Sequence, residues 1–227
     1  MNRMVGDGEL ESLMIIERRI ACFGVLLAMA LTLAGCKIVP IGQEQAEDKA
    51  GAFDATSYAT GLWTKQALPH FFANAKPAAE VIAATMADFA EAGDKFGYRP
   101  GEGSPWSFIV NGAGIVTAKN TESRAGTLVV ALDGVVPPLE VALQIGPVIR
   151  GNAVRDALPF VSFKDFTNQI EYADAGKALT ALAVEGIAAG VAGLAVGDHV
   201  EFTGAISMAG ASDKLLVTPV VLKKAAP

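Results

Sequence analysis

Residues 106–118 read Trp-Ser-Phe-Ile-Val-Asn-Gly-Ala-Gly-Ile-Val-Thr-Ala, and this stretch decides the fold. It contains two β-rich runs, residues 106–110 and 114–118, with Gly112 between them and Gly114 at the start of the second. If the runs form one strand, the glycines allow it to bend, and a bent strand can pair with two different neighbours. A long first strand of this kind suits a small β-barrel.

Further β-rich runs follow at residues 127–132, 139–145, 199–208 and 214–222, with glycine and proline between the earlier ones. Between the third and fourth predicted strands, Asp174 is a plausible N-cap for an Ala-rich helix over about residues 177–194, ending at Gly197. Three strands, a connecting helix and two strands is the element order of an OB-fold, a five-stranded Greek-key barrel. A different α+β sheet is the main alternative.

The residues before the barrel predict two helices. Asp54 can cap a first helix that runs to about Leu68 and is stopped by Pro69. A second helix has Pro77 in its first turn and ends near Gly93. Its inward face comprises Val81, Ile82, Thr85, Met86 and Phe89. The expected fold class is therefore α+β, with a helical subdomain at residues 53–100 and an OB-like five-stranded barrel with an inserted helix at residues 101–227.

The N-terminal region has the pattern of an export signal. Arg18 and Arg19 precede an apolar run over residues 20–31, which is shorter than the roughly 20 residues of a bilayer span. The run leads to Leu-Ala-Gly-Cys at residues 33–36, where small residues and a thiol match the lipobox of bacterial lipoproteins. We expect residues 1–35 to be a signal peptide and Cys36 to carry acyl chains such as palmitate. Residues 36–52 would then be a polar tether.

Two points at this end of the chain stay open. Cys36 could instead be a buried cysteine at the end of an ordinary N-terminal helix. Translation could also begin at Met4 or Met14, because the acidic residues before Met14 are unusual at the start of a signal peptide.

Composition excludes several classes of function. A formal net charge of −6 without a basic run argues against nucleic-acid binding. Of two cysteines, only Cys36 remains after signal removal, so neither an internal disulfide nor a cysteine zinc site is expected. His70 and His199 have no ligand-like spacing. The sequence predicts a non-enzymatic protein without metal or cofactor.

Several polar and aromatic residues of the barrel domain are candidates for ligand binding. Arg124, Arg150 and Arg155 could converge at one end of the barrel, where guanidinium groups would bind a carboxylate, a phosphate or sugar hydroxyls. Asn168 and Gln169 add amide groups, and Trp106 could stack on a sugar ring. The alternative is that Arg124 and Arg155 pair locally with Glu122 and Asp156 and fix loops.

Five blocks in order resemble the family called domain of unknown function 2291, predicted periplasmic lipoproteins. They are residues 36–41, 103–108, 121–126, 144–151 and 165–171. The resemblance implies a lipoprotein of the cell envelope that faces the periplasm. From the usual genetic setting of the family, it also implies an association with ABC transporters of simple sugars. The family carries no established catalytic residues.

Three hypotheses of function follow. The first is a binding or accessory module, anchored to membrane lipid through acylated Cys36 and contacting sugar ABC transporter components or a small polar ligand. The second is a structural envelope lipoprotein that binds other proteins, and the third is a hydrolase of envelope carbohydrate.

Overall fold

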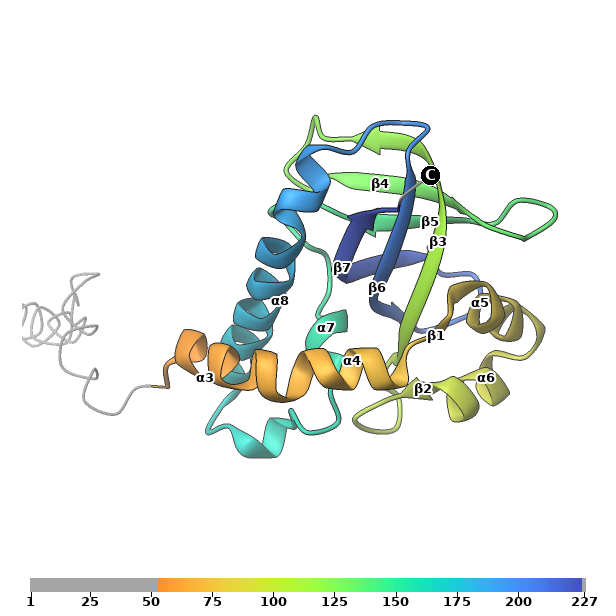
Figure 1. Cartoon of the computed structure of the whole chain (residues 1–227). Helices are drawn as coiled ribbons and strands as arrows, with labels where there is room; N and C mark the ends of the chain where they lie inside the picture. Colours follow the sequence, from red (N-terminus) through yellow and green to blue (C-terminus); the bar gives the residue numbers. More distant parts are fainter. Residues whose placement is uncertain (1–52, 226–227) are drawn as a thin grey trace, which may run out of the picture. The chain divides into compact units, whose positions relative to one another are not determined.

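Five strands of the computed structural model, which describes residues 53–225, close into a barrel (Figure 1). β3 (Trp106–Asn120) pairs with β6 (His199–Met208) and with β4 (Thr127–Leu132), and β5 (Glu140–Gln144) follows β4. β7 (Leu216–Lys224) joins β5 in parallel and β6 antiparallel, which closes the ring. This is the OB-fold order, so the predicted fold class is confirmed.

Gly114 is the point at which β3 changes partner. It is the register partner of Leu132 in β4 and of Val200 in β6. A Cβ at this position would lie 2.1 Å from the carbonyl oxygen of Ala131, which leaves no room for a side chain. A register shift between Val116 and Ala118 adds to the irregularity of the strand. The predicted bent first strand is confirmed.

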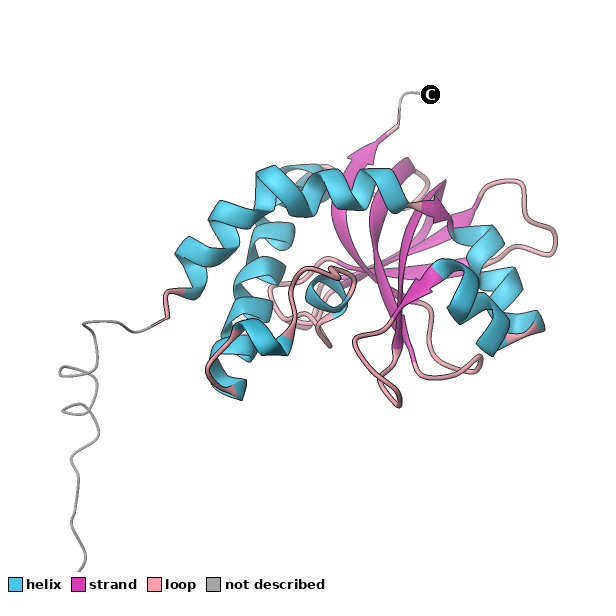
Figure 2. Cartoon of the chain, turned by 90° about the horizontal axis from the view of Figure 1, so that it is seen from below, coloured by secondary structure: helices cyan, strands magenta, loops and turns pink. Residues whose placement is uncertain are grey.

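Alternation along β3 separates two hydrophobic clusters. Phe108 and Val110 belong to the cluster inside the barrel, and Ile109 belongs to one on its outer face. Helix residues complete both clusters. Figure 2 shows the helices beside the strands, seen from below. The inner cluster is covered by α5 (Ala78–Ala87), α6 (Phe89–Phe96) and part of α8 (Gln169–Ala192). The outer cluster is built by α3 (Ala55–Leu62), α4 (Leu68–Asn74), α7 (Ala153–Asp156) and the rest of α8.

Shorter elements lie between these helices and strands. β1 (Lys76–Pro77) and β2 (Gly97–Tyr98) pair with β3, and the 3₁₀ turn η3 (Phe163–Asp165) leads towards α8.

The first helix does not stop at Pro69, which corrects the sequence prediction. Asp54 caps α3 as expected, accepting from the backbone N–H of Thr56 and Ser57 at 3.0 and 3.1 Å. The chain then passes through the π turn η2 (Trp63–Ala67) and continues as α4. Pro69 lies in the first turn of α4, after the wider turn, a place where proline is compatible with a helix.

The second predicted helix is two helices. Asp88 is extended between α5 and α6, and its side chain accepts from Glu91 N–H, so it ends one helix and caps the next. The helical region therefore extends past Gly93 to Phe96. Met86, expected on the inward face, is 67% exposed.

The inserted helix starts earlier than predicted. Asn168, not Asp174, caps α8, because its side chain accepts from the N–H groups of Ile170 and Glu171. Asp174 instead pairs with Lys177 at 2.8 Å on the helix surface. The helix ends at Ala192, before Gly197.

α8 packs closely on β7 through glycine. By length and composition α8 could cross a bilayer, but Leu179, Ala183 and Ile187 are buried within the domain. A Cβ on Gly190 would lie 2.4 Å from the Leu222 carbonyl oxygen, whereas one on Gly186 would meet its nearest neighbour at 3.9 Å. The helix therefore tolerates a side chain at one of these glycines and not at the other.

Opposite effects are expected from the same substitution at these two positions. Gly190→Ala should destabilise the domain by about 1–3 kcal/mol, because backbone atoms must move. Gly186→Ala should stabilise it by about 0.5–1 kcal/mol through helix propensity. Urea unfolding of the mature chain with Cys36 replaced by serine measures both. Equal effects at the two sites would contradict the packing of α8 on β7.

Candidate functional site

The structure places Arg155 in a local ion pair. Its guanidinium lies 2.7 Å from the Asp156 carboxylate and 3.8 Å over the ring of Tyr172. It also donates to the Tyr172 carbonyl oxygen at 3.4 Å, and the residue is only 9% exposed. These contacts join α7 to α8, and they agree with the alternative in which this arginine fixes the local structure.

Asn168 and Gln169 are consecutive residues at the start of α8, whereas Trp106 belongs to β3. The Asn168 side chain caps α8, and Gln169 is exposed in the first turn of that helix. Trp106 begins β3 and packs where Gly93 leaves room for its ring. The Arg99 guanidinium lies 4.3 Å over the same ring, so a cation covers one face of the indole.

Arg124 and Arg150 are exposed, on neighbouring loops. The Arg124 carbonyl oxygen accepts from Val148 N–H at 3.1 Å, and Arg150 N–H donates to the buried Gln144 side chain at 2.8 Å. Gln144 also donates to the Thr218 hydroxyl at 2.9 Å, so it fixes the loop after β5. Within the described residues, Arg124 has no ion pair with Glu122.

The six candidate side chains do not share one pocket. Among five of the best-formed pockets of residues 53–225, only Arg150 lines one, a cavity of 360 Å³ beside Lys214. Their role in ligand binding stays a prediction. Cys36, the candidate lipidation site, lies outside the described residues.

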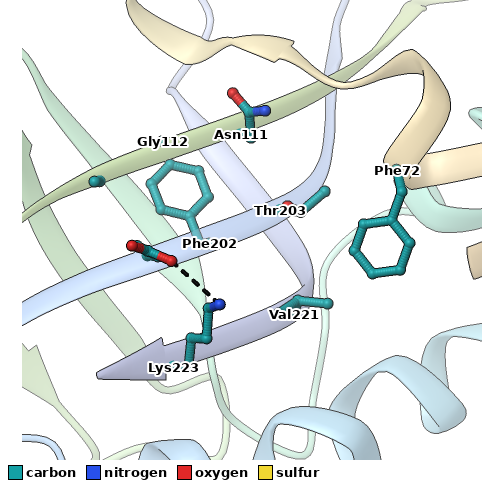
Figure 3. A pocket seen from close by; sticks show the side chains of 9 residues that line it. Phe72, Asn111, Gly112, Phe202, Thr203, Val221 and Lys223 are labelled. Atoms are coloured by element: carbon teal, nitrogen blue, oxygen red, sulfur yellow. Dashed lines mark ion pairs between the residues drawn. The ribbon is translucent and has the colours of Figure 1, made fainter. Parts of the chain in front are cut away.

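A groove of 420 Å³ on the outer face of β3, β6 and β7 offers a more complete set of groups (Figure 3). Strand register aligns its polar residues in two rows. In the first row, Asn111 of β3 pairs with Thr203 of β6, which pairs with Val221 of β7. The second row contains, in the same strand order, Ala113, Glu201 and Lys223. Gly112 and Phe202 form part of the floor, where a Cβ on Gly112 would lie 2.8 Å from the Phe202 ring.

Phe72 closes one side of this groove. It comes from α4 and is 58% exposed, whereas its neighbour Phe71 is fully buried. Figure 3 shows its ring standing beside Val221 and Thr203. At the other end, Glu201 and Lys223 form an ion pair at 3.3 Å, the dashed line of the figure, with both side chains at least half exposed.

The groove combines an apolar ring with an amide, a hydroxyl, a carboxylate and an ammonium group. Such a set can bind a small molecule that has an apolar face and several hydroxyls. Sequence reasoning missed it, because polar residues that alternate along a strand are also typical of an ordinary solvated face.

The two histidines have separate surroundings. His199 Nε2 lies 2.6 Å from Asp133 Oδ2 in an exposed pair. His70 is half-buried, and this burial lowers its pKa below the ordinary 6.5, partly offset by the backbone of Ala157. Among residues 53–225, no three His, Cys, Asp or Glu side chains are arranged to hold a metal ion.

A pH dependence follows from His70. Folding favours the neutral ring, so the unfolded chain binds more protons, and stability rises with pH in this range. The contribution of the neutral His70 ring to the stability of the fold is present above pH 6.5. It is lost as the pH falls through the lowered pKa of His70 in the folded protein. We expect His70→Gln to reduce the fall in thermal stability between pH 7 and pH 5, compared with His199→Gln. An unchanged pH profile in His70→Gln would contradict this.

The fold defines a class: an OB-fold domain with helices on its flanks. The chain belongs to the family of predicted periplasmic lipoproteins DUF2291, whose model matches residues 26–223. The protein is therefore a lipoprotein of the cell envelope on the periplasmic side, as its lipobox predicts.

A solved structure shows the same fold. An OB-fold protein from Thermotoga maritima superposes with a TM-score of 0.63 at 19% sequence identity, covering 77% of this chain and 100% of that chain. No protein with a curated description shows significant sequence similarity to the chain.

Proposed function

We propose that this envelope lipoprotein is a non-catalytic binding module that holds a simple sugar in the groove over β3, β6 and β7 and works beside a sugar ABC uptake system. The observation that carries the proposal is the exposed ring of Phe72, which stands beside polar groups that strand register aligns on the sheet. The association with sugar uptake is supported by the genetic setting that the family implies.

A sugar matches these groups because it has C–H faces as well as hydroxyls. The Phe72 ring supplies an apolar surface for a C–H face. The Asn111 amide and Thr203 hydroxyl can each donate and accept, as sugar hydroxyls require. Glu201 and Lys223 add charge-assisted hydrogen bonds at the far end. The volume of 420 Å³ is in the range of small-molecule sites.

The presence of one carboxylate among the groove residues favours binding over hydrolysis. Glu201 is the single carboxylate that lines it in the described structure, and it is paired with Lys223. Glycoside hydrolysis normally requires two carboxyl groups about 5–9.5 Å apart. This supports the binding hypothesis over the hydrolase.

Thermal-shift measurements with simple pentoses and hexoses test the proposal. A sugar at 100 times its dissociation constant should stabilise the mature chain by about 2.7 kcal/mol. Phe72→Ala should weaken the affinity about tenfold, which is ~1.4 kcal/mol. The matched control is Phe163→Ala, because Phe163 is 47% exposed and does not line the groove. If no sugar stabilises the protein, or if both variants weaken binding equally, the proposal fails.

A second observation favours the protein-binding hypothesis. A groove of 540 Å³ lies between the loop at residues 147–152 and α8. Its walls include Ile149, Val184 and Val148, which is 41% exposed. Exposed apolar surface with a polar rim is typical of protein interaction sites.

Crosslinking in intact cells separates the two roles. A photoreactive residue at Val148 should trap components of a sugar transporter if the protein is an accessory of uptake. The same residue at Ile170, which is 72% exposed and outside this groove, is the control. Capture of other envelope proteins alone, from Val148 and not from Ile170, would favour the structural role.

A further inference from the structure

A second cavity, of 300 Å³, lies on the other flank of α4 and has a different chemical character from the groove. Phe72 projects from α4 to the groove, whereas the same helix contributes His70 and Asn74 to this cavity. Lys76 of β1, Lys95 of α6, Tyr98 of β2 and Ser107 of β3 complete its polar lining. Five separate elements thus bring polar side chains to one place.

Ser107 is the least expected of these residues. It is 2% exposed, and its hydroxyl has no hydrogen-bond partner among the described residues. The neighbouring Phe108 faces the interior of the barrel, so alternation turns Ser107 to the outer side, where it lines the cavity opposite its register partner Tyr98. A buried hydroxyl without a partner is unfavourable, and an apolar residue would fill this position better unless the hydroxyl binds something.

The charge of the cavity is positive. Lys76 and Lys95 line it, and neither forms an ion pair within residues 53–225. Lys95 Nζ lies 4.7 Å over the Phe96 ring, which keeps the ammonium group close to the wall. None of the residues that line the cavity is acidic. A ligand there meets two ammonium groups without a competing carboxylate.

His70 and Asn74 form a mutually fixed part of the cavity wall. The Asn74 amide donates to His70 Nδ1 at 3.2 Å and to the His70 carbonyl oxygen at 2.9 Å. With Nδ1 accepting, the neutral ring carries its proton on Nε2. The edge-on contact with Phe160, at 5.4 Å between ring centroids, holds the imidazole in place.

We propose that this cavity binds a small oxyanion, the phosphate or carboxylate group of a ligand, with Ser107 as a hydrogen-bond donor and Lys76 and Lys95 as the neutralising charges. Hydroxyl and ammonium donors without acidic neighbours are the groups that recognise such anions. The inference is independent of the sugar groove, since the two sites share no lining residue.

Calorimetric titration of the mature chain, with Cys36 replaced by serine, tests the site with inorganic phosphate and with acetate. Binding of at least one anion is expected, and it should weaken with rising salt. The Lys76→Met/Lys95→Met variant should lose at least tenfold in affinity, and Lys65→Met, an exposed lysine outside the cavity, should lose little. The absence of binding, or equal loss in both variants, overturns the proposal.

Ser107→Ala provides the sharper test. It should weaken anion binding several-fold without lowering the thermal stability of the anion-free protein, because it removes an unpaired hydroxyl. Sedimentation with phosphatidylglycerol vesicles then separates two sources of phosphate. If the protein binds the vesicles and this binding depends on Ser107, the ligand of the site is a lipid headgroup. If the protein binds the free anion but not the vesicles, the ligand is a soluble molecule. Unchanged anion affinity in Ser107→Ala contradicts the site.

Discussion

Replacement of Cys36 by serine is expected to abolish lipid incorporation. The thiol is the nucleophile to which the lipid is attached, and serine has no thiol. Because two acyl chains are enough for stable anchoring and one is marginal, the modification decides whether the mature chain stays at the membrane. The family match makes the protein an envelope lipoprotein, and Cys36 is the residue of the lipobox that can carry the lipid.

Metabolic labelling with an alkyne fatty acid, followed by intact mass analysis, measures this effect. The unchanged protein should start at Cys36 and carry the label, and Cys36→Ser should carry none. Cys22→Ser is the matched control, because Cys22 lies in the apolar run that the predicted signal cleavage would remove. A label that persists in Cys36→Ser would place the anchor elsewhere.

The largest effect on stability is expected at Gly114. In Gly114→Val the side chain would start 2.1 Å from the Ala131 carbonyl oxygen, at the point where β3 leaves one partner for another. Backbone cannot yield there without opening the barrel, so we expect a loss above about 3 kcal/mol, the upper part of the overpacking range.

Urea unfolding, or the soluble yield if the variant does not fold, measures this loss. Gly210→Val is the control, because a Cβ at Gly210 meets nothing within 4 Å, and its effect should stay within about 0.5 kcal/mol. A Gly114→Val protein as stable as Gly210→Val would show that β3 does not bend as described.

The barrel could be predicted from the sequence because its signals are local. Residues 127–132 and 199–208 alternate or are continuously apolar between turn residues, and both predicted strands coincide with β4 and β6. The glycines of β3 mark the close backbone approach that makes the strand bend. Each of these features is visible within a few consecutive residues.

The predicted helix boundaries were wrong where tertiary structure outweighs the local signals of the sequence. Pro69 is a helix breaker in sequence, but the π turn before it changes the hydrogen-bond register while Trp63 and Phe71 stay buried on the barrel. Asp174 and Asn168 are both good N-caps, and the packing of Ala175 and Leu179 does not distinguish between them.

The candidate site could not be predicted for a different reason. The groove takes Phe72, Asn111, Thr203 and Lys223 from four elements, and α4 and β3 are far from β6 and β7 in the chain. The register of β3, β6 and β7 aligns the last three residues, and the position of α4 adds Phe72; no local pattern encodes either arrangement. The arginines were more conspicuous in sequence, yet Arg155 is held by Asp156 and Tyr172 next to it in the fold.

The central claim is that this lipoprotein binds a simple sugar over β3, β6 and β7. Titration of the isotope-labelled mature chain with the most stabilising sugar, followed by amide chemical shifts, tests it residue by residue. The account predicts saturable shifts at Phe72, Asn111 and Thr203, with the amides around Phe163 unchanged. Chemical-shift changes that occur only at residues outside the groove, or no changes at saturating sugar, would contradict it.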